Sequence, residues 1–123
     1  MTKANISLVL GDPAGIGPEL VAKVLSQPSF RDLANIIIIA DRRELEKGMD
    51  IAGARFPYRE ITTTDNLQFA PGEPLLLNHD WSTRTPFEYG NATEQSGVYI
   101  LETLKKAVEL TQQGITSGIC FAP

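Results

Sequence analysis

The sequence predicts an α/β fold in which helices pack against a layered, largely parallel β-sheet. Two observations lead to this class. Short apolar runs alternate along the chain with segments whose apolar residues recur at helical spacing, which is typical of β-α-β units. One run, "NIIIIAD" at residues 35–41, is almost entirely apolar, as in a parallel strand that is buried on both faces. We see no internal repeat, low-complexity tract or linker, so the elements are expected to belong to one domain.

The first predicted unit is a strand, a glycine-rich loop and a helix. Residues 6–10 are a short, mostly apolar run that suits a buried strand. The loop "GDPAGIGPEL" follows at residues 11–20. Pro18 suits the first turn of a helix, because its missing N–H would have no partner there. Pro28 predicts the end of this helix. Its predicted apolar face consists of Leu20, Val21, Val24 and Leu25.

The second predicted unit is the strand at residues 35–41 and the helix that follows it. Asp41 and Glu44 have the spacing of a capping box, with aspartate in place of serine or threonine. The helix is expected to run to about Ala52, because Gly53 is placed to end it.

The middle of the chain is less regular. "PYREITT" at residues 57–63 predicts a weak strand, "APGEP" at 70–74 a turn, and "LLLN" at 75–78 a short strand. The polar stretch "HDWSTRTPFEYGNATEQ" at 79–95 predicts a loop, and loops of that length are usually functional or disordered.

A long helix and a strand complete the predicted fold. The helix is expected to begin near Thr93 and to end at Gly114. "TSGICFAP" at residues 116–123 then predicts another buried strand. The predicted apolar stripe of the helix is Val98, Leu101, Leu104, Val108 and either Leu110 or Thr111.

Composition and charge exclude several classes of protein. The chain has 123 residues, of which 42% are hydrophobic and 21% charged, as in an ordinary globular segment. A net charge of −4 argues against a general nucleic-acid binder. No apolar run approaches the ~20 residues that span a bilayer, so no membrane partner is expected. Cys120 is the single cysteine and cannot form an internal disulfide, which favours a cytoplasmic location.

The glycine-rich loop is the strongest functional signal. A loop between a strand and a helix presents backbone N–H groups at the positive end of the helix, where phosphate binds well. Gly11, Gly15 and Gly17 have the spacing G-x-x-x-G-x-G, which matches neither the dinucleotide fingerprint G-x-G-x-x-G nor a P-loop. Two interpretations therefore stay open: a site where a ligand approaches the backbone, and a tight turn whose glycines serve packing.

The string "GDPAGIGPEL" resembles the N-terminal signature of the 4-hydroxythreonine-4-phosphate dehydrogenase family. It is similar, more loosely, to the "GDGIGPE" turn of isopropylmalate and isocitrate dehydrogenases. Gly90 and Gly97, followed by "LETLKKAVEL" and "GITSGICFAP", continue the resemblance to the end of the chain. The last residues, Cys-Phe-Ala-Pro, are similar to the branch of 4-phospho-D-threonate and 4-phospho-D-erythronate dehydrogenases.

This resemblance implies an isopropylmalate/isocitrate dehydrogenase-like α/β fold of which residues 1–123 are the N-terminal part. It implies oxidation of a secondary alcohol in a small phosphorylated hydroxy acid or amino acid, with NAD as hydride acceptor and decarboxylation as an allowed second step. It implies a homodimer and a divalent metal ion whose histidine ligands lie outside this segment. The cofactor-binding residues carried over are Gly11, Asp12, Gly15 and Gly17, and the catalytic residues stay unknown.

Other candidate residues have ordinary structural readings beside the functional ones. His79 matches no ligand position of the family, and a lone loop histidine is usually solvated; Asp80 beside it would be at most a co-ligand. Asp12 either orients a ligand or caps its own turn. Glu19 in a first helical turn is favourable without any function. Cys120 is expected to be a buried, unreactive thiol.

Basic and aromatic residues give weaker signals. Arg84 and the Arg42-Arg43 pair could meet a phosphate, although surface arginines are common. Trp81, Phe87 and Tyr89 in the polar loop are expected to form a lid or a subunit contact, with the contact preferred over a role in catalysis.

Three classes of function remain in competition. The first is the N-terminal part of the NAD- and metal-dependent dehydrogenase described above. The second is a non-catalytic α/β module whose glycine loop holds a phosphate or nucleotide, and the third is an acyl- or phosphate-transfer enzyme of similar architecture. The dehydrogenase hypothesis predicts that residues 1–123 alone are inactive and expose sheet edges that other parts of a longer protein cover.

Overall fold

Five parallel strands form the centre of the computed structural model, which describes residues 3–123. They form one sheet in the order β3-β4-β2-β1-β5. The prediction of an α/β fold with a parallel sheet is therefore confirmed. The strands are β1 (Asn5–Val9), β2 (Asn35–Ala40), β3 (Arg59–Ile61), β4 (Leu75–Asn78) and β5 (Gly118–Phe121).

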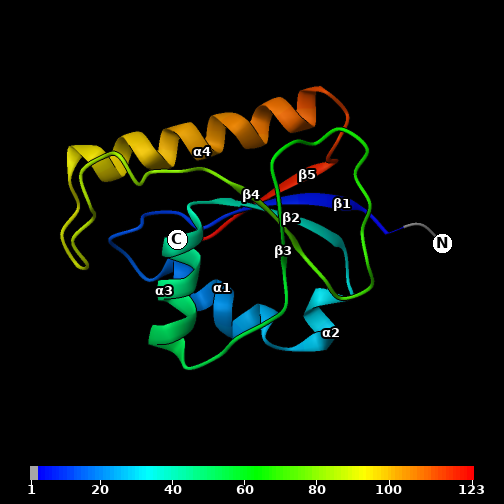
Figure 1. Cartoon of the computed structure of the whole chain (residues 1–123), viewed down its shortest axis with the longest axis horizontal. Helices are drawn as coiled ribbons and strands as arrows, with labels where there is room; N and C mark the ends of the chain where they lie inside the picture. Colours follow the sequence, from blue (N-terminus) through cyan, green and yellow to red (C-terminus); the bar gives the residue numbers. More distant parts are fainter. Residues whose placement is uncertain (1–2) are drawn as a thin grey trace.

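Helices cover both faces of the sheet (Figure 1). The helices α1 (Gly17–Leu25), α2 (Pro28–Arg31) and α3 (Arg42–Ala52) lie on one face, and α4 (Glu94–Gln112) lies on the other. The isoleucines of β2 explain this arrangement. Ile36 and Ile38 pack with α1 and α3, while Ile37 and Ile39 pack with α4, so β2 is buried on both sides as predicted.

The ends of the long helices follow the predicted signals. Thr93 caps α4 in a capping box with Ser96, and Gly114 leaves the helix with a positive φ of 76°. Gly53 ends α3 with a φ of 62°, a left-handed conformation that suits glycine. Asp41 caps α3 by accepting a hydrogen bond from the Arg43 N–H.

Glu44 does not complete the predicted capping box. The Asp41 N–H donates instead to the Tyr99 hydroxyl at 2.7 Å, and the buried Glu44 Oε2 makes no hydrogen bond. Burial raises the pKa of Glu44 above its ordinary value, and the positive charge of Lys47 offsets only part of this effect.

The predicted apolar faces of two helices need correction. Val98, Leu101 and Val108 lie on the outside of α4, with Leu101 67% exposed. Leu110 is buried as predicted and Leu104 is half-buried, but the rest of the buried face of α4 is Ser96, Tyr99, Thr103 and Ala107. Small residues there let the helix approach the sheet closely, and Tyr99 fills the space near its start. Val24 of α1 is also exposed, at 46%.

Two smaller corrections concern the segments near the edges of the sheet. The weak strand predicted over residues 57–63 is limited to Arg59–Ile61. The short helix α2 begins at Pro28, where the sequence analysis predicted only the end of α1. Both segments are short, so their periodicity carries little information.

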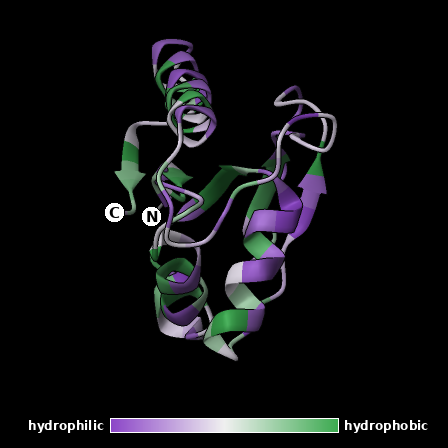
Figure 2. Ribbon diagram, turned by 90° about the vertical axis from the view of Figure 1, so that its left-hand side faces the viewer, coloured by the Kyte–Doolittle hydropathy of each residue, from purple (hydrophilic) through white to green (hydrophobic). Residues whose placement is uncertain are grey.

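β5 stands at one edge of the sheet and is largely exposed (Figure 2). Cys120 is therefore an exposed thiol, and the prediction that it is buried is wrong. The reason is that, among the described residues, β5 pairs with β1 on one side only and forms the edge of the sheet. Within residues 3–123, no helix is both long and apolar enough to cross a membrane.

Candidate functional site

The carboxyl ends of β1 and β5 meet at the glycine loop, defined here as residues 11–17. The Ala122 N–H donates to the Val9 carbonyl oxygen at 3.0 Å, so the chain after β5 runs beside the loop after β1. From β1 the chain crosses to β2 through α1, whereas β5 is reached through α4 on the opposite face. Ligands of open α/β sheets bind outside the carboxyl ends of the strands, and the glycine loop lies at that end of β1 and β5.

Gly11 and Gly17 are required by the packing of the chain on itself. A Cβ atom at Gly11, whose φ is 77°, would overlap the Ala122 carbonyl oxygen. A Cβ atom at Gly17 would overlap the Leu10 carbonyl oxygen and lie 2.8 Å from that of Pro123. These two glycines therefore bring the ends of β1, β5 and α1 together at one corner of the sheet.

Asp12 and Gly15 form the turn of the loop. The Asp12 side chain accepts a hydrogen bond from the Ala14 N–H at 2.8 Å, and its carbonyl oxygen accepts one from the Gly15 N–H at 2.9 Å. Asp12 thus caps its own turn, the structural reading of this residue. A Cβ atom at Gly15 would meet only Asp12, no closer than 3.4 Å. Gly15 is consequently the loop glycine that packing does not require.

The surface beside Gly15 is a shallow groove between the loop and α3. Its lining includes Glu19, Lys47 and Tyr89, and its volume of about 10 Å³ is at the lower limit for holding one water molecule. Gly48 of α3 closes its floor, because a Cβ atom there would lie 2.5 Å from the Pro18 carbonyl group. The described residues alone therefore do not enclose a nucleotide at this groove.

The tip of the polar loop at residues 79–92, called the 79–92 loop below, reaches the glycine loop. The Gly90 N–H donates to the Ala14 carbonyl oxygen at 2.7 Å. The Tyr89 hydroxyl donates to Glu19 Oε1 at 2.9 Å. The nearby carboxylate raises the pKa of Tyr89, because it favours the protonated hydroxyl.

The base of the 79–92 loop is built into the protein through an aromatic cluster. The Trp81 ring stacks on Phe87 with centroids 5.2 Å apart, and both rings meet Tyr99 of α4 edge-on. Trp81 is only 3% exposed, so its own ring lies inside the protein and is not available for the predicted lid or subunit contact. Its ring is needed to cover the start of α4.

Asp41 fixes the same region from the end of β2. Its carboxylate accepts hydrogen bonds from the Trp81 N–H and from the Arg43 guanidinium. Burial by itself would raise the pKa of Asp41, but these hydrogen bonds outweigh it and hold the pKa below its ordinary value. Asp41 therefore acts here as a buried structural carboxylate.

His79 belongs to a polar group under α4. His79 Nε2 lies 2.9 Å from Glu102 Oε1, and Arg84 Nη1 donates to both Glu102 oxygens at 2.8 and 3.0 Å. Partial burial would raise the pKa of Glu102, but Arg84 and His79 lower it overall. Asp80 accepts a hydrogen bond from the Ser82 N–H and does not join His79 in a site. Over residues 3–123, no three potential metal-ligating side chains come together.

The arginines that the sequence offered as phosphate ligands lie beside carboxylates of the protein itself. Arg43 pairs with Asp41 and Arg84 pairs with Glu102, while Arg42 lies 4.0 Å from Glu60. Arg84 also lies over the Trp81 ring, 4.2 Å from its centroid. These arginines anchor loops and helices in the structure, and none of them reaches the glycine loop.

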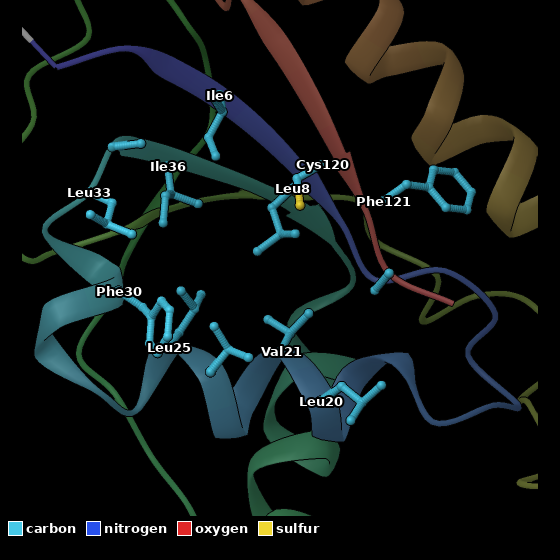
Figure 3. Close-up of a pocket in the computed structure, with 13 residues that line it drawn as sticks. Ile6, Leu8, Leu20, Val21, Leu25, Phe30, Leu33, Ile36, Cys120 and Phe121 are labelled. Carbon is cyan, nitrogen blue, oxygen red and sulfur yellow. The ribbon is translucent and has the colours of Figure 1, made fainter.

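A larger apolar cavity than the groove beside Gly15 lies elsewhere, between α1, α2 and the β1–β5 side of the sheet (Figure 3). Its volume is about 350 Å³. Leu8, Val21 and Leu25 point into it, and Cys120 lies at its β5 side (Figure 3). It offers almost no hydrogen-bonding groups for a phosphorylated ligand, so we interpret it as an incomplete part of the core.

Sequence reasoning located the glycine loop but missed what surrounds it. No sequence pattern pointed to Gly48. The need for glycine there comes from α1, which packs against this position and is far away in the sequence. Tyr89 was considered, but its partner Glu19 lies 70 positions away in the sequence. Pairs of that kind become visible only in the folded chain.

The chain matches one protein family and several of its members. Residues 32–123 match the family model described as pyridoxal phosphate biosynthetic protein PdxA. A protein of Pasteurella multocida, provisionally named a 4-hydroxythreonine-4-phosphate dehydrogenase, is 55% identical over 100% of this chain and 37% of its own length. One of Symbiobacterium thermophilum, provisionally named a D-threonate 4-phosphate dehydrogenase, is 25% identical over 99% of this chain and 36% of its own length.

The fold agrees with a solved structure. The crystal structure of a 4-hydroxythreonine-4-phosphate dehydrogenase from Burkholderia phymatum superposes with a TM-score of 0.87 at 27% identity. The match covers 100% of this chain and 37% of that protein. The chain thus spans little more than a third of the length of the relatives that it matches.

Proposed function

This chain belongs to the PdxA family, and on that premise we propose that it is the N-terminal part of a dehydrogenase acting on a small phosphorylated hydroxy acid or amino acid. The observation that carries the proposal is the family match over residues 32–123 together with the glycine loop at the carboxyl ends of β1 and β5. The relatives are named for two substrates, 4-hydroxythreonine 4-phosphate and D-threonate 4-phosphate. Both names describe a phosphorylated four-carbon acid that carries a hydroxyl group.

We propose NAD as the cofactor and the glycine loop as one of its contacts. When bound, NAD would accept hydride from the alcohol carbon of the substrate. The Ala14 and Gly15 N–H groups already donate to Asp12. An anionic group would therefore meet the first turn of α1, where N–H groups have no helical partners. Gly15 would let it approach, while Gly11 and Gly17 keep that turn against β1 and β5.

A divalent metal ion is also part of the proposal, but this segment does not provide its site. His79, the single histidine of the chain, is held by Glu102, and no cluster of metal-ligating side chains exists within the described residues 3–123. We therefore assign the metal ligands and the acid–base groups to other parts of a longer, homodimeric, cytoplasmic protein. Residues 1–123 alone are then expected to be inactive.

A binding module without catalysis is the second candidate function. Within the described residues 3–123, no group of metal-ligating side chains comes together, which favours this function for the isolated chain. A phosphorylated ligand or NAD would then bind to residues 1–123 without turnover.

The direct test uses the full-length protein that contains this chain. It is incubated with NAD, a divalent metal ion and either 4-hydroxythreonine 4-phosphate or 4-phospho-D-threonate, and NADH formation is followed by absorbance. We expect turnover with at least one of the two substrates and none with residues 1–123 alone. Turnover by the isolated chain, or none by the full-length protein with either substrate, would contradict the proposal.

A further inference from the structure

Two hydrogen bonds connect the tip of the 79–92 loop to the glycine loop and the first turn of α1. The Gly90 N–H donates to the Ala14 carbonyl oxygen at 2.7 Å, and the Tyr89 hydroxyl donates to Glu19 Oε1 at 2.9 Å. Gly90 has a φ of 81°, a conformation that glycine adopts readily. The tip is closed by a turn in which Asn91 donates to Glu88 through both its N–H and its side-chain amide.

The tip is attached to a fixed base. Arg84 connects the 79–92 loop to Glu102 of α4, and Trp81 is buried against Tyr99 while its N–H donates to Asp41. These contacts tie the loop to β2 and α4, on the opposite side of the sheet from α1. Because the base of the 79–92 loop is fixed to β2 and α4, the contacts at its tip hold the glycine loop in a defined position relative to the sheet.

The position of Glu19 matters for an anionic ligand. Its carboxylate lies in the first turn of α1, where the helix carries partial positive charge. A carboxylate free to move there would compete with a phosphate for the same N–H groups. The Tyr89 hydroxyl holds the carboxylate in one place.

We propose that the tip of the 79–92 loop is a clamp that holds the glycine loop and the Glu19 carboxylate in the arrangement that admits the cofactor. Tyr89 and Glu19 are positioning residues in this proposal, since they act through the loop and do not touch the reacting atoms. The inference rests on the proposed function for the identity of the ligand, which is NAD. The clamp itself rests only on the contacts within residues 3–123.

The test variant is Tyr89→Phe in the full-length protein, which removes one hydroxyl group from a half-exposed ring. Tyr58→Phe is the matched control, because the Tyr58 hydroxyl also donates to a carboxylate, that of Glu46, on the far side of α3 from the glycine loop. Hydrogen exchange of residues 11–20 is measured without ligand, and KM and kcat are measured for NAD.

We expect Tyr89→Phe to raise exchange of residues 11–20 and the KM for NAD about threefold to tenfold, as for loss of one hydrogen bond, with kcat nearly unchanged. Tyr58→Phe should change neither. Glu19→Gln keeps an acceptor for the Tyr89 hydroxyl and should retain most of the protection. Glu19→Ala should raise exchange of residues 11–20 as Tyr89→Phe does, but with a smaller rise in KM, because no carboxylate is left to compete with the ligand. If Tyr89→Phe only destabilised the whole protein, the melting temperature would fall, and the KM for NAD would not rise while kcat stayed the same.

Unchanged exchange of residues 11–20 in Tyr89→Phe and Glu19→Ala would overturn the clamp. Faster exchange with an unchanged KM for NAD would overturn its positioning role. Because exchange is measured without ligand, it decides the clamp even if the full-length protein shows no dehydrogenase activity. That inactivity would count against the proposed function alone.

Discussion

Gly17 and Gly15 lie two positions apart in the same loop, but the structure gives them different constraints. The sequence pattern does not separate the two residues, because a glycine pattern does not show what surrounds each residue. Gly17 faces the Leu10 carbonyl group, whereas Gly15 faces only Asp12. The position of the loop was predictable from its composition, but the assignment of each glycine to packing or to a ligand was not.

The first prediction follows from this difference. In the full-length protein, Gly17→Ala should lower the free energy of unfolding by at least ~1–3 kcal/mol, because the new methyl group overlaps backbone atoms that have little room to move. Gly15→Ala should change it by less than about 1 kcal/mol. Urea unfolding of both variants is the measurement. Equal stability of the two variants would contradict the packing described here.

Asp41 carries a prediction about pH. Its pKa is lowered in the folded state from an ordinary value of 3.8, so its contribution to stability is complete above that value and is lost as the pH falls through the lower folded pKa. Asp41→Asn should cost about 1–3 kcal/mol at neutral pH, because hydrogen bonds to a charged group are lost. The difference from wild type should shrink below about pH 4. Urea unfolding of both proteins between neutral pH and about pH 4 or below is the measurement. A stability difference between wild type and Asp41→Asn that did not change with pH would contradict this role of Asp41.

At the scale of elements, the helices and strands were largely predictable, but their buried faces were less so. The signals at Thr93, Gly53 and Gly114 are local, so they located the helix ends correctly. The inner face of α4 depends on the aromatic cluster of the 79–92 loop, which is brought to the helix only by folding. Apolar periodicity therefore selected Val98 and Leu101, which lie outside.

The contact between α1 and α3 gives the element-scale prediction. Gly48→Ala should destabilise the full-length protein by roughly 1–3 kcal/mol, because its Cβ would lie 2.5 Å from the Pro18 carbonyl group. Gly97→Ala in α4 is the matched control, since nothing lies within 4 Å of its Cβ. Alanine favours a helix over glycine by about 0.5–1 kcal/mol, so this variant should be neutral or more stable. Thermal melting of both compares them, and similar losses would contradict the close helix contact.

At the scale of the whole molecule, the β5 side of the sheet exposes a strand edge and apolar side chains. β5 has a free edge, Ile119 and Phe121 are 38% and 51% exposed, and the apolar cavity of Figure 3 opens beside Cys120. Exposed edges and apolar patches of this kind favour association. We propose that other parts of the longer protein cover them, so that residues 1–123 are the larger part of a discontinuous domain.

Isolated residues 1–123 should therefore be marginally stable and prone to self-association. Light scattering and thermal melting of the isolated chain would show oligomers and a broad transition. A sharp, cooperative melt from a clean monomer would show a self-sufficient domain instead and would favour the binding module over the dehydrogenase.

The central claim is that the glycine loop of a PdxA-type dehydrogenase contacts NAD, and Gly15 tests it most directly. Gly15→Ala adds a Cβ atom that the fold accommodates, no closer than 3.4 Å to Asp12, but that would obstruct a ligand approaching the loop. The KM for NAD of the full-length enzyme is the measurement, with the melting temperature recorded in parallel and Gly97→Ala as control. The account predicts a KM raised about tenfold or more at an almost unchanged melting temperature, as for loss of ~1.4 kcal/mol of binding free energy. An unchanged KM in the folded variant would show that the loop is only a turn that closes the corner between β1, β5 and α1.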